Sequence, residues 1–387
     1  MEFTRRKIRD PILIIAMAQF FTTGIYLSFF PYFSIYLQKL GFSTSYITTL
    51  ITMEGSARVV GLLVGGVCAD FRYPFFFTFL GFFITSLSYF LLSFSSCVSL
   101  YPLCFCLIGF FYGFAYPCES NLIVKLEKKR DFKKVYALIK TAMMFAAIIA
   151  PVIGIFVLKQ PTMITFFAGI FFFIYAFIIL IFFPAIDSVT TQKQSTFYSE
   201  VLNDKLFVKL IGCLLILSIC SAMVYTSLPI YLEKFFEDGA SIYTTIFFVN
   251  RWLVVLSQIF IVKVFEKFKD INVIFSSIFL YCLVFLLLSI FGNSPSLTII
   301  LFALFTVVEL VVMPNAYGLI MQFAAKENSG KYQAFANLRY FLARPISAFL
   351  GGIFIPYGYF YYVAYFLFSF FSIPFFLLVK KDFFKLK

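Results

Sequence analysis

Histidine is absent from the 387 residues of this chain, tryptophan occurs once, and charged residues make up only 13%. Without histidine the chain cannot form a His-based metal site, a haem site with a His ligand, a Ser-His-Asp triad or a His proton relay. Long polar segments are also missing, so no stretch between the apolar runs can fold as a soluble domain. We therefore expect no metal and no cofactor, and a function carried by apolar helices.

What the chain has instead is hydrophobic sequence, at 62% of residues with 60 phenylalanines and a mean hydropathy of +0.97. A bilayer core about 30 Å thick is crossed by roughly 20 helical residues. Backbone in lipid must satisfy its own hydrogen bonds, which favours helices, and membrane strands would be shorter and alternating. The sequence predicts twelve transmembrane helices at 11–37, 46–69, 74–94, 98–123, 134–158, 162–183, 207–231, 241–264, 271–292, 297–322, 332–355 and 358–379.

Lysine and arginine lie almost wholly in alternate loops, as topology signals do. The opposite side has only Lys39, Lys159 and Lys234. This asymmetry predicts cytoplasmic N and C termini and an even number of helices. It also explains the net charge of +13 without a nucleic-acid partner. The partners that we expect are the lipid bilayer, a small-molecule substrate and protons, and we expect a monomer.

The two halves of the chain repeat each other. Residues 35–39 read IYLQK and residues 230–234 read IYLEK, and each segment is followed by a short polar loop and a pair of threonines. Further matches in the same order, about 195 residues apart, indicate a duplication. The predicted fold is therefore an all-α membrane protein with two pseudo-symmetric six-helix bundles, a transporter plan. The bundles are 1–184 and 207–387, and a cytoplasmic linker is predicted at 185–206.

The eight cysteines all lie in or beside apolar runs, and we interpret them as small buried apolar residues rather than ligands or disulfides. They are Cys68, Cys97, Cys104, Cys106, Cys118, Cys213, Cys220 and Cys282.

The loop after the second predicted helix reads GVCADFR. It is similar to the signature Gly-x-x-x-Asp-Arg-x-Gly-Arg-Arg of the major facilitator superfamily. Gly66, Asp70 and the basic residue Arg72 match, which implies a gating motif, but the following glycine and the second basic pair are missing. The resemblance covers essentially the whole chain and implies the twelve-helix fold of that superfamily.

Two further segments carry the resemblance. Residues 146–154, AAIIAPVIG, resemble the family's Gly-x-x-x-Gly-Pro-x-x-Gly packing motif with alanines for glycines. The full glycine form is associated with exchangers, so the degraded form argues only weakly for export. Residues 24–27, GIYL, and 54–61, EGSARVVG, resemble the phenylpropionate-permease and lactose-permease branch. That branch implies proton-coupled uptake of small organic solutes.

Ionisable residues inside the predicted helices are expensive and usually border a water-filled interior. The chain has eight: Glu54, Arg58, Glu119, Lys140, Arg251, Glu309, Arg339 and Arg344. Glu54 and Arg58 are spaced to meet on one helix face, either as a pair that lowers the cost of insertion or as a pair that opens on protonation. Glu119 and Lys140 resemble the sugar-binding pair of lactose permease, although Lys140 could instead reach the cytoplasmic surface.

Arg251, Arg339 and Arg344 lie near mid-depth in the second half, where Glu309 is the only internal acid. Arginine cannot lose its proton to escape burial. The excess of positive charge favours an anionic substrate, although Arg344 precedes Pro345, where a freed carbonyl could hold it instead. Asn250 and Tyr26 are further candidates for the substrate site.

Proton coupling without histidine needs a carboxylate in an apolar environment. Glu309 stands alone on a helix of Leu, Val and Phe and is the first candidate. Glu54 is the second, because its neighbour Arg58 favours the ionised form.

These observations predict a secondary transporter that moves a small organic solute, anionic or amphipathic, by proton-coupled uptake. The alternatives are proton-driven efflux of drugs or siderophores, a membrane-embedded transferase and a substrate sensor. A transferase is disfavoured because its usual His or acidic clusters beside large loops are missing. We expect a multi-pass protein of a cell membrane, the bacterial inner membrane.

Overall fold

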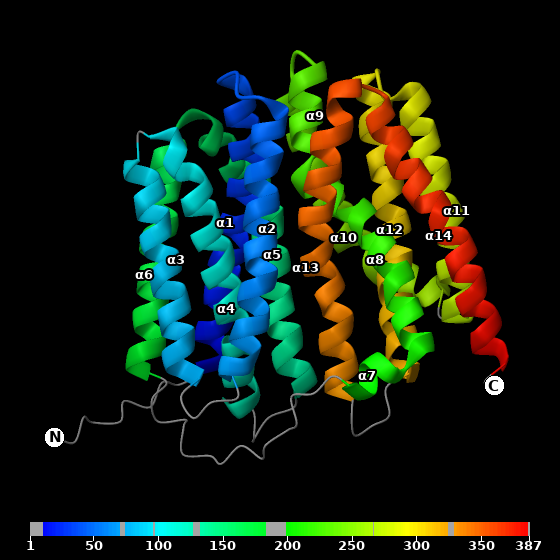
Figure 1. The fold of residues 1–387 in the computed structure, drawn as a ribbon, viewed down its shortest axis with the longest axis horizontal. Helices are drawn as coiled ribbons and strands as arrows, with labels where there is room; N and C mark the ends of the chain where they lie inside the picture. The colour runs from blue at the N-terminus through cyan, green and yellow to red at the C-terminus, as the bar shows by residue number, and fades with distance from the viewer. Residues whose placement is uncertain are drawn as a thin grey trace. The chain divides into compact units, whose positions relative to one another are not determined.

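The computed structural model describes residues 11–69, 74–95, 97–126, 132–182, 199–265, 267–323 and 329–385, which contain helices and no strand (Figure 1). In the first half the helices are α1 Pro11–Lys39, α2 Thr44–Ala69, α3 Pro74–Phe94, α4 Tyr101–Leu126, α5 Phe132–Lys159 and α6 Pro161–Phe182. In the second half they are α7 Ser199–Asn203, α8 Lys205–Thr226, α9 Leu228–Phe235, α10 Gly239–Phe265, α11 Asp270–Phe291, α12 Pro295–Phe323, α13 Ser329–Phe354 and α14 Phe360–Lys385.

Twelve segments of the described chain are long and apolar enough to cross a membrane. They coincide with the twelve predicted runs, so the all-α membrane fold is confirmed. Most boundaries agree within about two residues, as for α3 at Pro74–Phe94. The largest difference is at the C terminus, where α14 continues to Lys385, six residues past the predicted end at 379. The apolar pattern stops there, but the helix continues through Lys380 and Lys381.

The seventh predicted helix, 207–231, is wrong as a single helix, because it breaks at Ser227 into α8 and α9. Pro229 lies in the first turn of α9, where a missing N–H and a fixed φ fit a helix start. The Ser227 hydroxyl lies 2.8 Å from the Tyr361 hydroxyl and 3.2 Å from the Tyr365 hydroxyl. Both tyrosines are on α14, which therefore holds the break in place.

The predicted linker, 185–206, contains structure at its end. The short helix α7 and the start of α8 fall within it, and residues 183–198 lie outside the described part of the chain. Asp204 caps α8, because its side chain accepts a hydrogen bond of 3.0 Å from the backbone N–H of Phe207. The Tyr332 hydroxyl donates to the other carboxylate oxygen at 3.2 Å.

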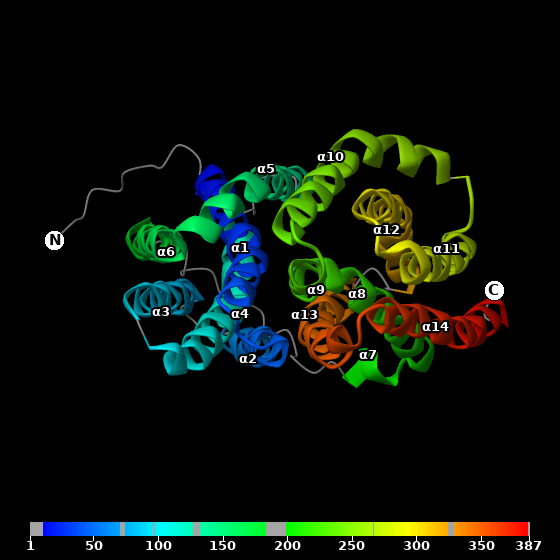
Figure 2. The same cartoon turned by 90° about the horizontal axis from the view of Figure 1, so that it is seen from above.

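The chain divides into two compact units. Unit 1 contains residues 1–29 and 56–195, and unit 2 contains residues 30–55 and 196–387. In unit 1, α3 lies between α4 and α6 (Figure 2). In unit 2, α8 packs against α13 and α14, and α12 packs against α10 and α11. The two six-helix bundles of the sequence repeat stay a prediction, since the ends of α1 and α2 cluster with the second half.

Glycines bring α2 and α4 of unit 1 into backbone contact. A Cβ atom on Gly61 would overlap the Phe110 carbonyl oxygen, and one on Gly65 would overlap the Phe114 carbonyl oxygen. On the facing helix, a Cβ on Gly113 would overlap the Arg58 carbonyl. Small residues four apart are the usual means of close helix packing in membranes, where dispersion contacts replace the hydrophobic effect.

This packing predicts opposite results at two neighbouring glycines. Gly65→Ala forces α2 away from α4 and should lower the unfolding temperature of the purified protein, with a cost of about 1–3 kcal/mol. Gly66→Ala is the matched control, because its Cβ would meet nothing within 4 Å and alanine favours the helix. Thermal unfolding in detergent measures both, and equal unfolding temperatures for the two variants would contradict the close contact.

The end of unit 2 that contains residues 30–55 packs tightly against α13. The Gly55 Cα faces Pro345, whose Cδ would lie 2.9 Å from an added Cβ. Further along the contact between α2 and α13, a Cβ on Gly352 would overlap the Thr48 hydroxyl. The Tyr32 hydroxyl of α1 donates to Thr244 of α10 at 3.1 Å. Hydroxyl and glycine contacts therefore join the ends of α1 and α2 to α10 and α13.

All eight cysteines are free, and five of them are buried as the sequence predicts. Cys97 differs, since it is exposed in the loop before α4. A hydrogen bond to the Ser99 hydroxyl lowers the pKa of its thiol.

Candidate functional site

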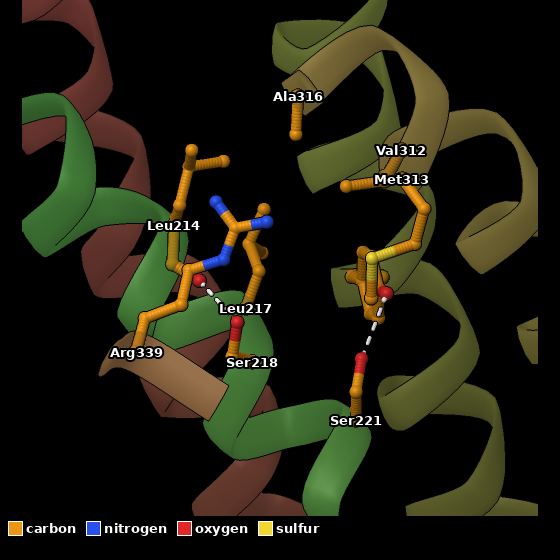
Figure 3. Close-up of a pocket in the computed structure, with 9 residues that line it drawn as sticks. Leu214, Leu217, Ser218, Ser221, Val312, Met313, Ala316 and Arg339 are labelled. Carbon is orange, nitrogen blue, oxygen red and sulfur yellow. Dashed lines mark hydrogen bonds between the residues drawn. The ribbon is translucent and has the colours of Figure 1, made fainter. Parts of the chain in front are cut away.

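A small cavity lies inside unit 2 between α8, α11, α12 and α13. Its polar lining comes from Ser218 and Ser221 on α8, Tyr281 on α11 and Arg339 on α13, and the rest is Leu214, Leu217, Val312, Met313 and Ala316. Figure 3 shows the Arg339 guanidinium directed between the leucines of α8 and the residues of α12. The space open to the centres of water molecules is about 10 Å³, which holds about one ordered water.

Arg339 is deeply buried, with only 2% of its surface exposed. Its Nη2 donates to the Tyr340 hydroxyl at 2.6 Å, and the guanidinium lies 4.6 Å from the centre of that ring. Its Nε and Nη1 have no hydrogen-bond partner. A buried guanidinium with donors left unused is costly unless an anion or water completes its shell. Beside the guanidinium there is room for one water or one anionic oxygen, so Arg339 is a candidate contact for an anion.

Glu309 on α12 does not line this cavity, but it lies within interaction range of Ser221 and Tyr281, which do. The Ser221 hydroxyl approaches its carboxylate, and the charge of Arg251 on α10 acts on it. No direct ion pair joins Arg251 to Glu309, and the Arg251 Nε has no partner. The Arg251 guanidinium lies 5.4 Å from the Tyr225 ring centre and 5.1 Å from that of Phe247. Glu309 and Arg251 therefore interact through their charges without forming a direct ion pair.

Helix α10 presents two more polar groups inside unit 2. Asn250 is 1% exposed, and neither its amide nitrogen nor its amide oxygen has a partner. The Tyr243 hydroxyl is also buried and unpartnered, and it lies within the electrostatic range of Arg344 on α13. Native proteins leave few buried polar groups unsatisfied. Helix α10 is therefore a second element of unit 2 whose side chains could contact a polar ligand.

In unit 1, Arg58 is buried at 6% exposure and lies over two tyrosine rings. Its guanidinium carbon is 4.3 Å from the ring centre of Tyr26 and 4.5 Å from that of Tyr112. The two rings are nearly parallel. Cation–π contacts of this kind are strongest away from water, so the rings stabilise the cation within the apolar interior. Glu54, one turn earlier on α2, is fully buried.

Glu119 on α4 is held by neutral donors. The Gln19 amide lies 2.6 Å from one carboxylate oxygen, and the Tyr175 hydroxyl donates to the other. The predicted partner Lys140 lies on α5, but its side chain is outside the described part of the chain. The same holds for Asp70 and Arg72 of the predicted gating motif. Its third residue, Gly66, lies in α2 with open space around its Cα.

Sequence reasoning missed several partners of the charged residues. Gln19 is a lone amide in an apolar run and could have been noticed. Tyr175, Tyr281 and Tyr340 are indistinguishable in sequence from the other aromatic residues, since only the fold brings each to a charge. Ser221 likewise resembles the many serines that bond to their own helix backbone.

An ion pair lies where α1 ends. The Lys39 Nζ is 3.6 Å from the Glu233 Oε1 on α9, and the Glu233 side chain is only 10% exposed. Burial raises the pKa of Glu233 above its ordinary value, while Lys39 opposes this shift and Asp238 adds to it slightly. The two residues belong to the repeated IYLQK and IYLEK segments, so the repeat places an acid and a base at matching helix ends.

This shift predicts a pH dependence of stability. A carboxyl whose folded pKa is raised binds its proton more tightly in the folded state, so stability is greatest below its ordinary pKa and falls as pH rises through the raised value. We expect Glu233→Gln to remove that fall, and Lys39→Met to enlarge it. Unfolding temperatures measured from about pH 4 to about pH 7 test this. Parallel curves for wild type and Glu233→Gln would show that Glu233 does not contribute.

The sequence of residues 12–348 matches the family model of the Major Facilitator Superfamily. That match covers most of the chain. The protein belongs to the Major Facilitator Superfamily. It is a multi-pass membrane protein, and its family indicates a transporter rather than an enzyme. No curated protein matches this superfamily member.

Solved structures of the superfamily share its fold. A mutant of the nucleoside transporter NupG superposes with a TM-score of 0.76 at 14% identity, covering 96% of this chain and 100% of that chain. A POT family transporter in complex with 5-aminolevulinic acid gives 0.76 at 13% identity, covering 95% of each chain. A POT family transporter with a thioalcohol-conjugated peptide gives 0.74 at 14% identity, covering 97% of this chain and 96% of that chain. Identities this low show the fold alone.

Proposed function

We propose that this protein is a secondary transporter that takes up a small organic anion together with protons. The observation that carries the proposal is the buried Arg339, whose unused donors face a cavity lined by Ser221 and Tyr281, both within interaction range of Glu309. Two of the similar structures contain a bound organic solute, 5-aminolevulinic acid in one and a thioalcohol-conjugated peptide in the other. An anion at Arg339 would complete the hydrogen bonds that the guanidinium leaves open.

The arrangement supplies a physical basis for coupling. When Glu309 is ionised, its charge offsets that of Arg251, and the site as a whole attracts an anion weakly. When Glu309 takes up a proton, the positive charge of Arg251 is no longer offset, and a low-dielectric interior screens that change less than water does. Proton and anion therefore bind together, as symport requires.

The transport cycle proposed is alternating access of two six-helix bundles, 1–184 and 207–387, around a central site. Arg251, Arg339, Arg344 and Asn250 would contact the substrate from the second bundle. Glu119, Lys140 and Tyr26 would contribute from the first bundle, Glu54 with Arg58 would assist coupling, and Gly66, Asp70 and Arg72 would form the gating motif. We also propose cytoplasmic termini, a monomer and the bacterial inner membrane.

Right-side-out membrane vesicles test the direction of transport. With the exterior more acidic than the interior, uptake predicts accumulation of radiolabelled organic acids inside the vesicles, whereas a reversed gradient should empty them. Vesicles carrying Lys263→Met, which removes an exposed charge near the end of α10, are the matched control. Extrusion of substrate that is driven by the inward proton gradient would assign the protein to efflux instead.

A further inference from the structure

The Glu119 cluster in unit 1 contains a buried carboxyl group that the proposed transport cycle uses as a substrate contact and not for proton binding. Glu119 is 2% exposed on α4. Gln19 on α1 and Tyr175 on α6 approach its two oxygens, one each. The Tyr175 ring lies 4.9 Å from that of Phe82, so the surroundings are aromatic. Three helices thus converge on a single acid inside an apolar layer.

Both partners of Glu119 are uncharged. No described side chain forms a salt bridge with Glu119. Other titratable or charged groups facing this region are Tyr112, whose charge would act on Tyr175, and Arg58, which lies over the Tyr112 ring. Lys140 on α5 has its side chain outside the described part of the chain. An ionised carboxylate in such surroundings is costly, and protonation removes that cost.

The contact with Gln19 suits a protonated carboxyl group as well as an ionised one. The Gln19 Nε2 lies 2.6 Å from the Glu119 Oε2. The two ends of an amide side chain are interchangeable by a flip that leaves its shape unchanged. With the Gln19 carbonyl toward Glu119, the acid proton is donated to Gln19, while the other carboxyl oxygen accepts from Tyr175. Every polar atom of the carboxyl group is then satisfied without a buried charge.

We propose that Glu119 is a second proton-binding site of this transporter, held as a neutral acid by Gln19 and Tyr175 and separate from Glu309. Gln19 and Tyr175 are positioning residues, since each provides one hydrogen bond to the acid. The ligand is the proton itself, so no substrate needs to be identified. Proton binding to Glu119 is measured without a transport step and is therefore independent of the proposed anion uptake.

Infrared difference spectroscopy of the full-length protein in lipid vesicles tests the proposal. Stepping the buffer pH upward should remove a protonated-carboxyl band, and the band should decline about tenfold per pH unit above its midpoint. Glu119→Gln should lose this band, and Glu309→Gln should keep it. Tyr175→Phe should shift the band to higher wavenumber, because the carbonyl loses a hydrogen bond. A purely structural role for Tyr175 would leave the wavenumber unchanged.

Two results would overturn the assignment. If Glu119→Gln leaves the spectrum unchanged at every pH, Glu119 is ionised and holds no proton. If the Glu119 band persists undiminished at every accessible pH, the acid is permanently protonated and does not exchange its proton. Lys140→Gln distinguishes a neutral Glu119 from an ion pair between Glu119 and Lys140. If Glu119 is a neutral acid, its band is unchanged in this variant. A band that appears only in this variant would show that Lys140 keeps Glu119 ionised.

Discussion

Replacing Glu309 with glutamine should abolish accumulation driven by a proton gradient while leaving exchange intact. A symporter that moves one proton with each monovalent anion concentrates its substrate about tenfold for each pH unit of gradient. A tenfold ratio of proton concentration and a tenfold ratio of substrate concentration each correspond to about 1.4 kcal/mol. Glutamine resembles the protonated acid and cannot release a proton. The variant should therefore equilibrate substrate to a ratio of about one.

The measurement is paired. Proteoliposomes carrying wild type and Glu309→Gln are compared for accumulation under a pH gradient and for counterflow of labelled substrate at equal pH. Glu237→Gln, which neutralises an exposed carboxylate between α9 and α10, is the control and should behave as wild type. Undiminished accumulation by Glu309→Gln would transfer the coupling role to another carboxyl, with Glu54 and Glu119 the remaining buried candidates.

Replacing Arg339 with glutamine should change substrate binding and stability in opposite directions. Losing a charged partner of an anion costs about 2–3 kcal/mol, so the apparent affinity for substrate should fall roughly 30- to 150-fold. The empty protein should gain stability, because the variant no longer buries a guanidinium with unused donors. Arg339→Lys should bind better than Arg339→Gln but below wild type, because lysine keeps the charge and loses the planar fork.

Thermal unfolding of the purified variants, alone and with saturating substrate, gives both quantities. The expected result is a higher unfolding temperature without substrate and a smaller upward shift when it is added. A variant that unfolds earlier and keeps its substrate-induced shift would show that Arg339 has a structural role. Lys263→Met again provides a control in which a cation is removed from an exposed position.

The positions of the membrane helices could be predicted almost completely from the sequence, because such helices are specified by composition over about 20 residues. Even the repeat of Ile35–Lys39 at Ile230–Lys234 can be recognised in the amino-acid sequence. The exception is the break at Ser227, where hydropathy continues without interruption and only Pro229 signals the new helix. A hydropathy value averaged over about 20 residues does not detect such a break. The break is a change in backbone hydrogen bonding at one residue.

The candidate site was predictable only as a set of charges. Depth in the membrane follows from helix position, so the burial of Glu119, Arg339 and Glu54 could be anticipated. Partners could not, because a side chain direction depends on helix rotation, and phenylalanine covers lipid-facing and interior faces alike. The pairing of Glu119 with Gln19 spans 100 positions in sequence and required the folded unit.

We propose that buried charges in unit 2 couple an anion to protons. Accumulation of a panel of radiolabelled organic acids by proteoliposomes, with and without an uncoupler, tests it most directly. We predict that at least one acid is concentrated under an inward proton gradient and that the uncoupler collapses its accumulation to equilibrium. Accumulation that survives the uncoupler, or transport of neutral solutes with no organic acid carried, would contradict the account.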